Sequence, residues 1–249
     1  MYFFHPSGTV LTDVMLGRCS LPEGSKFLDL GCGTGDTAFY VSEKYGLDVT
    51  GADLSDAMLE RARRSHPELS FVKCDGQALD FASCTFDGAL MECAFSLMPR
   101  QEELLHELYC VLKPGAPLAI SDLYILEPDM ERARKNCIEA QKLIYHQRVD
   151  AECTQDQAYP SPFCLDGMFV KDLLLALLDD TGFDLEIWED HTKELRDYAA
   201  QLLMDHGSLE NACRRLLPEG EPGRTFCDAK IGRNTGYFIL VARKRKTAK

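Results

Sequence analysis

Short apolar runs alternate with segments of helical periodicity over most of the chain. The apolar runs predict five strands in the first half of the sequence, at residues 26–30, 47–53, 69–75, 86–92 and 117–124. Helical spacing of apolar residues predicts helices between them, at residues 38–45, 56–66 and 100–112. Strands that alternate with helices favour an α/β fold, in which a parallel sheet is covered by helices on both faces.

The alternation breaks between Ile125 and about Gly167. A helix is expected at residues 130–146 within this stretch, and the remainder is irregular. We therefore interpret residues 124–168 as a helical cap insertion that follows the fifth strand.

The regular pattern resumes after the cap and predicts the rest of the sheet. Gly182 is expected to end a helix, and Gly207 and Pro218 to end two later ones. The sixth and seventh strands are expected at residues 183–189 and 236–244. The chain is expected to form a single domain over residues 1–249, with residues 1–20 as an N-terminal lid segment.

A glycine-rich loop follows the first predicted strand, in the sequence "FLDLGCGTGDT". Gly31, Gly33 and Gly35 lie where ligands bind in open α/β sheets, outside the carboxyl ends of the strands. Glycine allows a positive φ and a close approach of the backbone to a ligand. The third glycine comes one position earlier than in a dinucleotide fingerprint, and the loop has no arginine to neutralise a pyrophosphate. Both features weigh against a nicotinamide-dependent oxidoreductase.

Acidic residues end the next two predicted strands. Asp53 follows the glycine loop by about 20 residues, where a carboxylate can accept both hydroxyls of a ribose. Asp75 can bind an adenine amino group, directly or through the neighbouring backbone. Two acids and no base favour an uncharged or cationic nucleoside. Asp29 lies inside the first strand and needs partners if buried, so it either caps the loop or contacts the nucleoside. Cys32 is interpreted as a small residue that fits the loop.

Five stretches match, in order and spacing, the successive motifs of class I S-adenosylmethionine-dependent methyltransferases. They are "LDLGCGTG", "GADLSDAML", "CDGQALDF", "FDGALMECAFSL" and "VLKPGAPLAISDLY". The chain most resembles the small-molecule type 11 group, closely over residues 21–124 and more loosely elsewhere. The resemblance implies a Rossmann-like three-layer sandwich with a seven-stranded, mostly parallel sheet whose last strand is antiparallel. It also implies S-adenosylmethionine as cofactor, S-adenosylhomocysteine as product and a small-molecule methyl acceptor.

The resemblance also implies which residues bind the cofactor. The glycine loop would hold its methionine part, Asp53 its ribose and residues 75–77 its adenine, while residues 92–96 would line the site of methyl transfer. The expected cofactor-binding residues are Asp29, Gly31, Cys32, Gly33, Gly35, Asp53, Leu54, Met58, Asp75, Gly76, Gln77 and Glu92.

Four further residues are candidates for the acceptor side. His5 lies in a segment that resembles those folding over the cofactor in related proteins, and it can act as a base. Cys93, Ser96 and Tyr124 follow the fourth strand or end the fifth. No catalytic residue is assigned, because the cofactor already activates the methyl group. A general base is needed only for a hydroxyl, amine or carbon acid.

Two alternative functions share this fold. The chain has some similarity to arsenite methyltransferases, and Cys93 with Cys153 and Cys164 of the cap can offer the thiolates that a soft metalloid prefers. The paired N-terminal cysteines of that family are absent, since only Cys19 precedes the glycine loop. The other alternative is a non-catalytic protein that binds S-adenosylmethionine.

Composition excludes several classes of partner. The 249 residues carry a net charge of −13, with 45% hydrophobic and 27% charged residues, as in soluble globular proteins. The only basic run is the C-terminal "ARKRKTAK", so neither a nucleic acid nor a membrane is expected as a partner. The eleven cysteines form no CxxC pair, which lowers the expectation of a metal site. We expect them to be reduced and the protein to be cytoplasmic, because no export signal is recognised.

Overall fold

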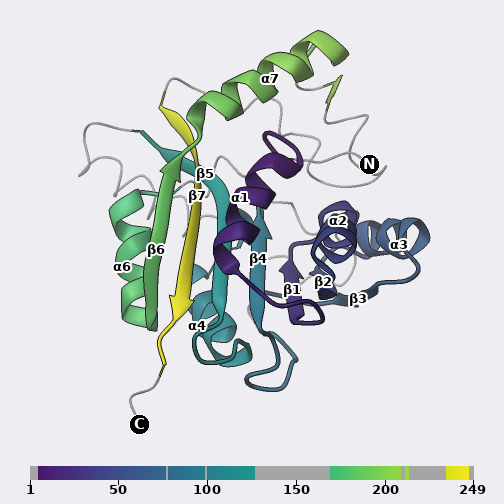
Figure 1. The fold of residues 1–249 in the computed structure, drawn as a ribbon. Coiled ribbons are helices and arrows are strands. Elements are labelled where there is room, and N and C mark those ends of the chain that lie inside the picture. The colour runs from purple at the N-terminus through teal and green to yellow at the C-terminus, as the bar shows by residue number, and fades with distance from the viewer. Residues whose placement is uncertain are drawn as a thin grey trace, which may run out of the picture.

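The fold is a seven-stranded sheet with helices on both faces (Figure 1). The computed structural model describes residues 5–76, 78–98, 100–126, 169–208, 211–212 and 234–246. The strands are β1 Lys26–Leu30, β2 Asp48–Asp53, β3 Ser70–Lys73, β4 Gly88–Glu92, β5 Pro117–Ile125, β6 Phe183–Asp190 and β7 Thr235–Lys244. All seven lie within a few residues of the strands that the sequence predicts.

The strand order is β3-β2-β1-β4-β5-β7-β6. Strands β1 to β5 pair in parallel, whereas β7 lies antiparallel between β5 and β6. The predicted Rossmann-like sheet with an antiparallel last strand is therefore confirmed. Strand β1 pairs with β2 on one side and β4 on the other, so the strand order reverses there. The loops after these strands meet at the edge where ligands bind in such sheets.

The helices connect the strands as expected, with one addition at the N-terminus. They are α1 Thr9–Cys19, α2 Asp36–Tyr45, α3 Asp56–Ser65, the 3₁₀ turn η1 Phe95–Leu97, α4 Gln101–Val111, α6 Lys171–Thr181 and α7 Thr192–His206. The expected cap lies outside the described residues except at its first positions, as does most of the helix expected after Gly207.

Local chemistry sets the ends of two of these helices. The Ser55 hydroxyl accepts a hydrogen bond from the Met58 amide at 3.2 Å and so caps the N-terminus of α3. Gly182 ends α6 with a φ of 104° and bonds back to the last turn, as its sequence position predicts.

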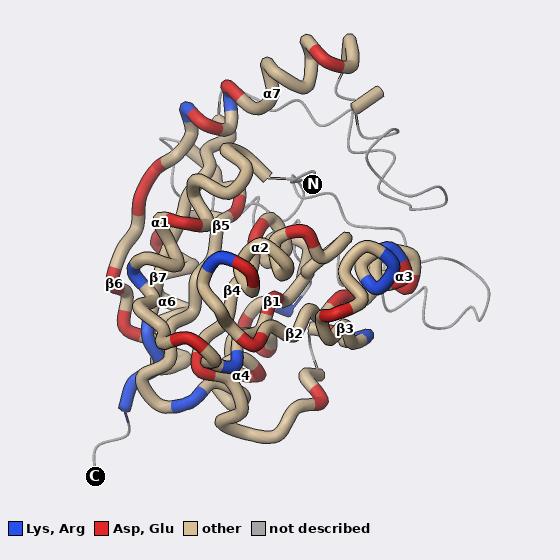
Figure 2. The backbone as a smooth tube through the Cα atoms, turned by 45° about the vertical axis from the view of Figure 1, so that its right-hand side comes forward, with Lys and Arg blue, Asp and Glu red and all other residues tan. Residues whose placement is uncertain are grey.

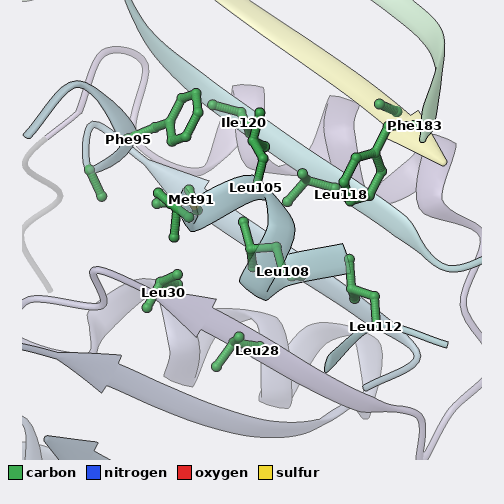
Figure 3. Packing of buried hydrophobic residues seen from close by; sticks show 14 of the residues in the cluster. Leu28, Leu30, Met91, Phe95, Leu105, Leu108, Leu112, Leu118, Ile120 and Phe183 are labelled. Atoms are coloured by element: carbon green, nitrogen blue, oxygen red, sulfur yellow. The ribbon is translucent and has the colours of Figure 1, made fainter. Parts of the chain in front are cut away.

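Apolar side chains form two cores, one on each face of the sheet. On one face, Leu28, Met91 and Ile120 pack with α4 and α6, and Figure 3 shows part of this cluster. On the other face, Phe27 and Leu90 pack with α1, α2 and α3. Neighbouring positions of a strand point to opposite faces of the sheet, so an unbroken run of apolar residues supplies both faces. The central strands are therefore almost fully buried.

Helix α1 joins the N-terminal segment to the sheet. It packs against β5 and β7, and its Asp13 carboxylate binds α2. The Asp13 oxygens accept hydrogen bonds from the hydroxyls of Tyr40 at 2.8 Å and Tyr45 at 2.7 Å, and from the Lys44 ammonium at 2.7 Å. Residues 9–19 of the expected lid are thus packed into the fold.

Within the described ranges, no helix is long and apolar enough to cross a bilayer. Acidic positions are spread over many of the described elements (Figure 2), in keeping with 40 acidic against 27 basic residues in the whole sequence.

Asp13→Asn should destabilise the protein, and the effect should depend on pH. Burial acts to raise the pKa of Asp13, but the bonds from Lys44, Tyr45 and Tyr40 outweigh it and hold that pKa below its usual value. The stabilisation is therefore present above about pH 4 and is lost as the pH falls further. Loss of about 1 kcal/mol should lower the Tm at pH 7 by about 2–4 °C. Thermal melts at pH 7 and pH 3 measure the change.

The matched control is Glu43→Gln, which removes one exposed carboxylate from the same helix as Lys44. It should leave the Tm nearly unchanged at both pH values. An equal loss in Asp13→Asn at pH 7 and pH 3 would show that the ionised carboxylate is not the stabilising group.

Candidate functional site

The glycine-rich loop between β1 and α2 is held against β2. Gly31, Gly33 and Gly35 all have positive φ, at 81°, 53° and 78°. The amides of Gly31 and Cys32 both donate to the carbonyl of Ala52, at 2.7 and 3.1 Å. The loop therefore turns sharply at the carboxyl end of β1 and stays attached to the neighbouring strand.

The three glycines differ in what a side chain would meet. A Cβ on Gly31 would lie 2.3 Å from the Cβ of Ala94, and one on Gly35 would lie 2.6 Å from the ring of Phe71. A Cβ on Gly33 would have no atom within 4 Å. Packing thus requires glycine at Gly31 and Gly35, whereas Gly33 presents its backbone to open space, where a ligand can approach.

Asp53 organises both the glycine loop and the start of α3. Its half-buried carboxylate accepts hydrogen bonds from the amides of Gly33 at 2.8 Å and Ser55 at 2.9 Å. Leu54 and Met58 follow on the same segment, and both are half-buried. Asp53, the residue expected to bind the ribose, therefore lies directly beside the open glycine.

The expected adenine residues lie just beyond β3. Asp75 is half-buried and forms an isolated bridge with Ala78. Gly76 is buried, and a Cβ there would lie 2.9 Å from the sulfur of Met98. Gln77 lies outside the described residues.

Asp29 is a buried acid that lies close to other acids. It is 3% exposed, and its Oδ2 meets no hydrogen-bond donor among the described residues. Burial raises the pKa of Asp29 well above its usual value, and the nearby charges of Glu92 and Asp53 raise it further. The same surroundings raise the pKa of the buried Cys32 thiol, which therefore stays neutral.

Glu92 ends β4 and binds the N-terminal segment. Its Oε1 accepts a hydrogen bond from the Thr12 hydroxyl at 2.9 Å, and its Oε2 lies 3.2 Å from Nε2 of His5. The side chains of His5 and Glu92 are 6% and 4% exposed. The same Nε2 lies 3.3 Å from the Thr37 hydroxyl. The fold thus brings His5 to the first turn of α2, just after the glycine loop, and to the end of β4.

The other acceptor-side candidates are arranged differently. Cys93 follows Glu92 directly and is half-buried, with its Sγ 3.4 Å from the hydroxyl of Tyr237. Ser96 is fully buried, and its hydroxyl donates to Asp122 at 2.7 Å.

Tyr124 is also buried, and its hydroxyl is bonded to Asp190 at the end of β6. Its ring packs edge-on against Trp188 and Phe238. The hydroxyls of Ser96 and Tyr124 are therefore both engaged within the protein.

The thiol-based alternative depends on residues that the structure does not describe. Cys153 and Cys164 both lie outside the described ranges. In the part of the chain that is described, no three His, Cys, Asp or Glu side chains gather as a metal site would require.

Several groups at this edge have no local signal in the sequence. Thr12 and Thr37 reach Glu92 and His5, and Asp122 and Tyr237 reach the turn after β4. Each joins elements that are far apart along the chain, so only the fold brings them together.

Comparison with known proteins supports one family. A family model described as a methyltransferase domain matches residues 27–115. The chain is 32% identical over 240 residues to O-methyltransferase resE of Aspergillus sclerotiorum, covering 91% of this chain and 78% of the relative. It is 26% identical over 246 residues to an O-methyltransferase of Pyrenophora dematioidea, covering 94% and 80%. Among solved structures, the [4+2]-cyclase SpnF shares the fold, with a TM-score of 0.72 and 22% identity over 96% of this chain and 81% of that chain.

Gly31→Ala should destabilise the protein more than Gly33→Ala. Both add a side chain at positive φ, which costs about 1–2 kcal/mol. Only the first also drives a methyl group into Ala94, which adds about 1–3 kcal/mol of overpacking. Urea denaturation of the two variants and the parent measures the difference. Equal losses would contradict the distinction between a packed glycine and an open one.

Proposed function

The chain belongs to the class I S-adenosylmethionine-dependent methyltransferases, and from that premise we propose that it methylates an oxygen atom of a small organic molecule. The observation that carries the choice of oxygen is the buried His5–Glu92 pair at the end of β4. A hydroxyl must lose its proton as it accepts a methyl group, and such a pair supplies the base. The two fungal relatives named as O-methyltransferases support the same choice.

The residues at the sheet edge fit the cofactor. When bound, S-adenosylmethionine supplies a methyl group already activated on a sulfonium cation. Asp29, Asp53 and Glu92 are acidic side chains close enough to affect one another, and such a cluster favours a positively charged ligand. The open face of Gly33 allows close approach of that ligand.

We assign the nucleoside part to the ends of β2 and β3. Asp53 ends β2 beside the open glycine, where its carboxylate accepts the amides of Gly33 and Ser55, and a carboxylate at such a strand end is the group that accepts ribose hydroxyls in nucleoside-binding folds. Asp75 and Gly76 would lie along the adenine. This leaves the glycine loop and Asp29 for the methionine part.

We assign His5 as the general base and Glu92 as the residue that orients it. If Nε2–H of His5 donates to Glu92, its Nδ1 carries the lone pair that takes the proton. The carboxylate then stabilises the imidazolium that forms. Thr12 donates to the other oxygen of Glu92 and so fixes the carboxylate.

The remaining candidates are assigned structural positions around the site rather than contacts with the reacting atoms. Ser96 and Tyr124 hold the frame of the site, because their hydroxyls are bonded to Asp122 and Asp190. Cys93 lies beside Glu92 and would face the acceptor side. We assign the rest of the acceptor site to the expected cap, most of which lies outside the described residues.

Asp53→Ala should weaken cofactor binding by at least tenfold, about 1.4 kcal/mol. Titration calorimetry with S-adenosylmethionine and S-adenosylhomocysteine measures the affinity, and circular dichroism checks that the variant is folded. The control is Asp48→Asn, an exposed acid at the opposite end of the same strand, which should bind normally. Equal affinity in Asp53→Ala and the parent would refute the ribose assignment, and no binding by the folded parent would refute the proposed function.

His5→Ala should lower kcat by about 10²–10⁴-fold on a hydroxyl acceptor. Acceptors are found by incubating the protein with S-adenosylmethionine and a panel of small phenols, thiols and arsenite, and measuring S-adenosylhomocysteine. Affinity for S-adenosylhomocysteine should change little in the variant. Full activity in His5→Ala would refute the assignment of His5 as the general base.

The same panel separates the alternatives. Turnover only with thiols or arsenite would favour the thiol-based reaction. Cofactor binding without any turnover would favour a non-catalytic binding protein. Mass spectrometry and NMR of the product identify the methylated atom.

A further inference from the structure

The turn that follows β4 leaves the strand in an unusual conformation. Cys93 has a φ of 50°, a region that non-glycine residues rarely adopt. The 3₁₀ turn η1 begins two residues later, at Phe95. Such a conformation persists only where the surrounding structure holds it.

Ser121 of β5 holds the turn from one side. Its carbonyl accepts the hydrogen bond of the Cys93 amide at 2.8 Å. Its hydroxyl accepts a bond from the Tyr237 hydroxyl at 2.9 Å, and the Tyr237 oxygen lies 3.4 Å from the thiol of Cys93. Both Ser121 and Tyr237 are completely buried. The backbone of Cys93 is therefore bonded to Ser121 directly, and its thiol is connected to Ser121 through Tyr237.

Asp122, the next residue of β5, holds the turn from the other face. Its Oδ1 accepts bonds from the Ser96 hydroxyl and the Leu123 amide, both at 2.7 Å. Its Oδ2 accepts the Ser96 amide at 2.8 Å. Asp122 and Ser96 are both 0% exposed. Each oxygen meets an N–H donor, so an amide side chain in this place would set its NH₂ against another N–H.

The turn is also pressed against the glycine loop. Ala94, between Cys93 and η1, is the residue that leaves no room for a Cβ on Gly31. Glu92 immediately precedes the turn. A displacement of the turn would therefore shift the end of β4, whereas Gly33, which has no neighbour within 4 Å of its Cβ position, does not touch the turn.

We propose that Asp122 is a positioning residue for methyl transfer: its carboxylate sets the turn from Cys93 to Leu97 and, through it, the placement of Glu92 and the acceptor. It touches neither reactant. This inference rests on the proposed function for its effect on catalysis, whereas its effect on the turn can be measured independently.

The charge of Asp122 gives the role a pH dependence. The donors that bind it, from η1 and from β5 itself, are uncharged, and its register partner on β7 is Phe238. On β4, Glu92 lies opposite Ser121 and so belongs to the other face of the sheet. Burial raises the pKa of Asp122 to about 6, against the lowering effect of Ser96, Leu123 and Phe95.

Stability and geometry then respond to pH in opposite directions. Because folding raises this pKa, the contribution of Asp122 to stability falls as the pH rises through about 6. Protonation below that pH relieves the burial of charge but removes acceptor capacity from the turn. A residue with only a structural role would move stability and activity together.

The experiment compares the parent, Asp122→Asn and Ser96→Ala, with Asp48→Asn as the control. Hydrogen exchange of the Cys93 and Ser96 amides, corrected for intrinsic rates, is followed from pH 5 to pH 8. The parent should protect both amides above pH 6 and lose protection below it. Asp122→Asn should leave them exposed at every pH, and Asp48→Asn should match the parent.

Kinetics on an acceptor from the panel complete the test. Asp122→Asn should lower kcat/KM for the acceptor at least tenfold, while S-adenosylhomocysteine affinity stays within threefold. It should also flatten the acid limb that remains in the His5→Ala background, where the proposed base no longer contributes to the pH profile. Ser96→Ala should show a smaller loss and retain the limb, and it serves if Asp122→Asn does not fold. If the two amides are as protected in Asp122→Asn as in the parent, the proposal is overturned, whatever the activity of the variant. Protection that is lost without any effect on kcat/KM would overturn the catalytic part alone.

Discussion

The site depends on how three carboxylates are accommodated at the carboxyl ends of β1, β2 and β4. Asp53 is satisfied by backbone amides, and Glu92 by a hydroxyl and a histidine. Asp29 keeps one oxygen without a donor among the described residues, and its pKa rises as a result of burial and of its acidic neighbours. Buried carboxylates that repel one another are stabilised when a positive charge binds beside them. In the proposed site, a cationic cofactor would relieve that repulsion, with these carboxylates as its counter-charge.

The N-terminal helix belongs to this arrangement. Two adjacent residues of α1 bind different elements: Thr12 bonds to Glu92 at the end of β4, and Asp13 bonds to Tyr40 and its neighbours on α2. The helix therefore links the end of β4 to α2, the helix that follows the glycine loop. His5, a few residues earlier, is placed beside Glu92 by the same packing. A segment that lies outside the alternating pattern thus supplies the proposed base and its support.

The sequence predicted the sheet well because its strands are apolar runs buried on both faces. It did not predict α1, because the apolar and polar positions do not mark the buried face: Val10 is 61% exposed, whereas Thr12 is completely buried. The third strand ends at Lys73 rather than Asp75, whose backbone instead pairs with Ala78 in an isolated bridge.

The candidate site also contains a part that could be predicted from the sequence and a part that could not. The glycine loop and Asp53 follow from spacing, because their function depends on backbone conformation at a strand end. The placement of Ser96 against Asp122 and of Thr12 against Glu92 could not be predicted, since these pairs lie 26 and 80 residues apart. Such contacts have no local pattern and exist only once the sheet has formed.

The difference between locally formed and long-range contacts bears on specificity for the acceptor. The proposed cofactor side consists of backbone amides, positive-φ glycines and one strand-end acid, all within a short stretch of chain. The proposed acceptor side consists of side chains from α1, β4, η1 and β5 that meet through long-range hydrogen bonds. Substitutions that alter the turn after β4 can therefore change which acceptor fits while leaving Gly33 and Asp53 in place. The contact between Gly31 and Ala94 sets the limit, because there the two sides touch with no room for a single methyl group.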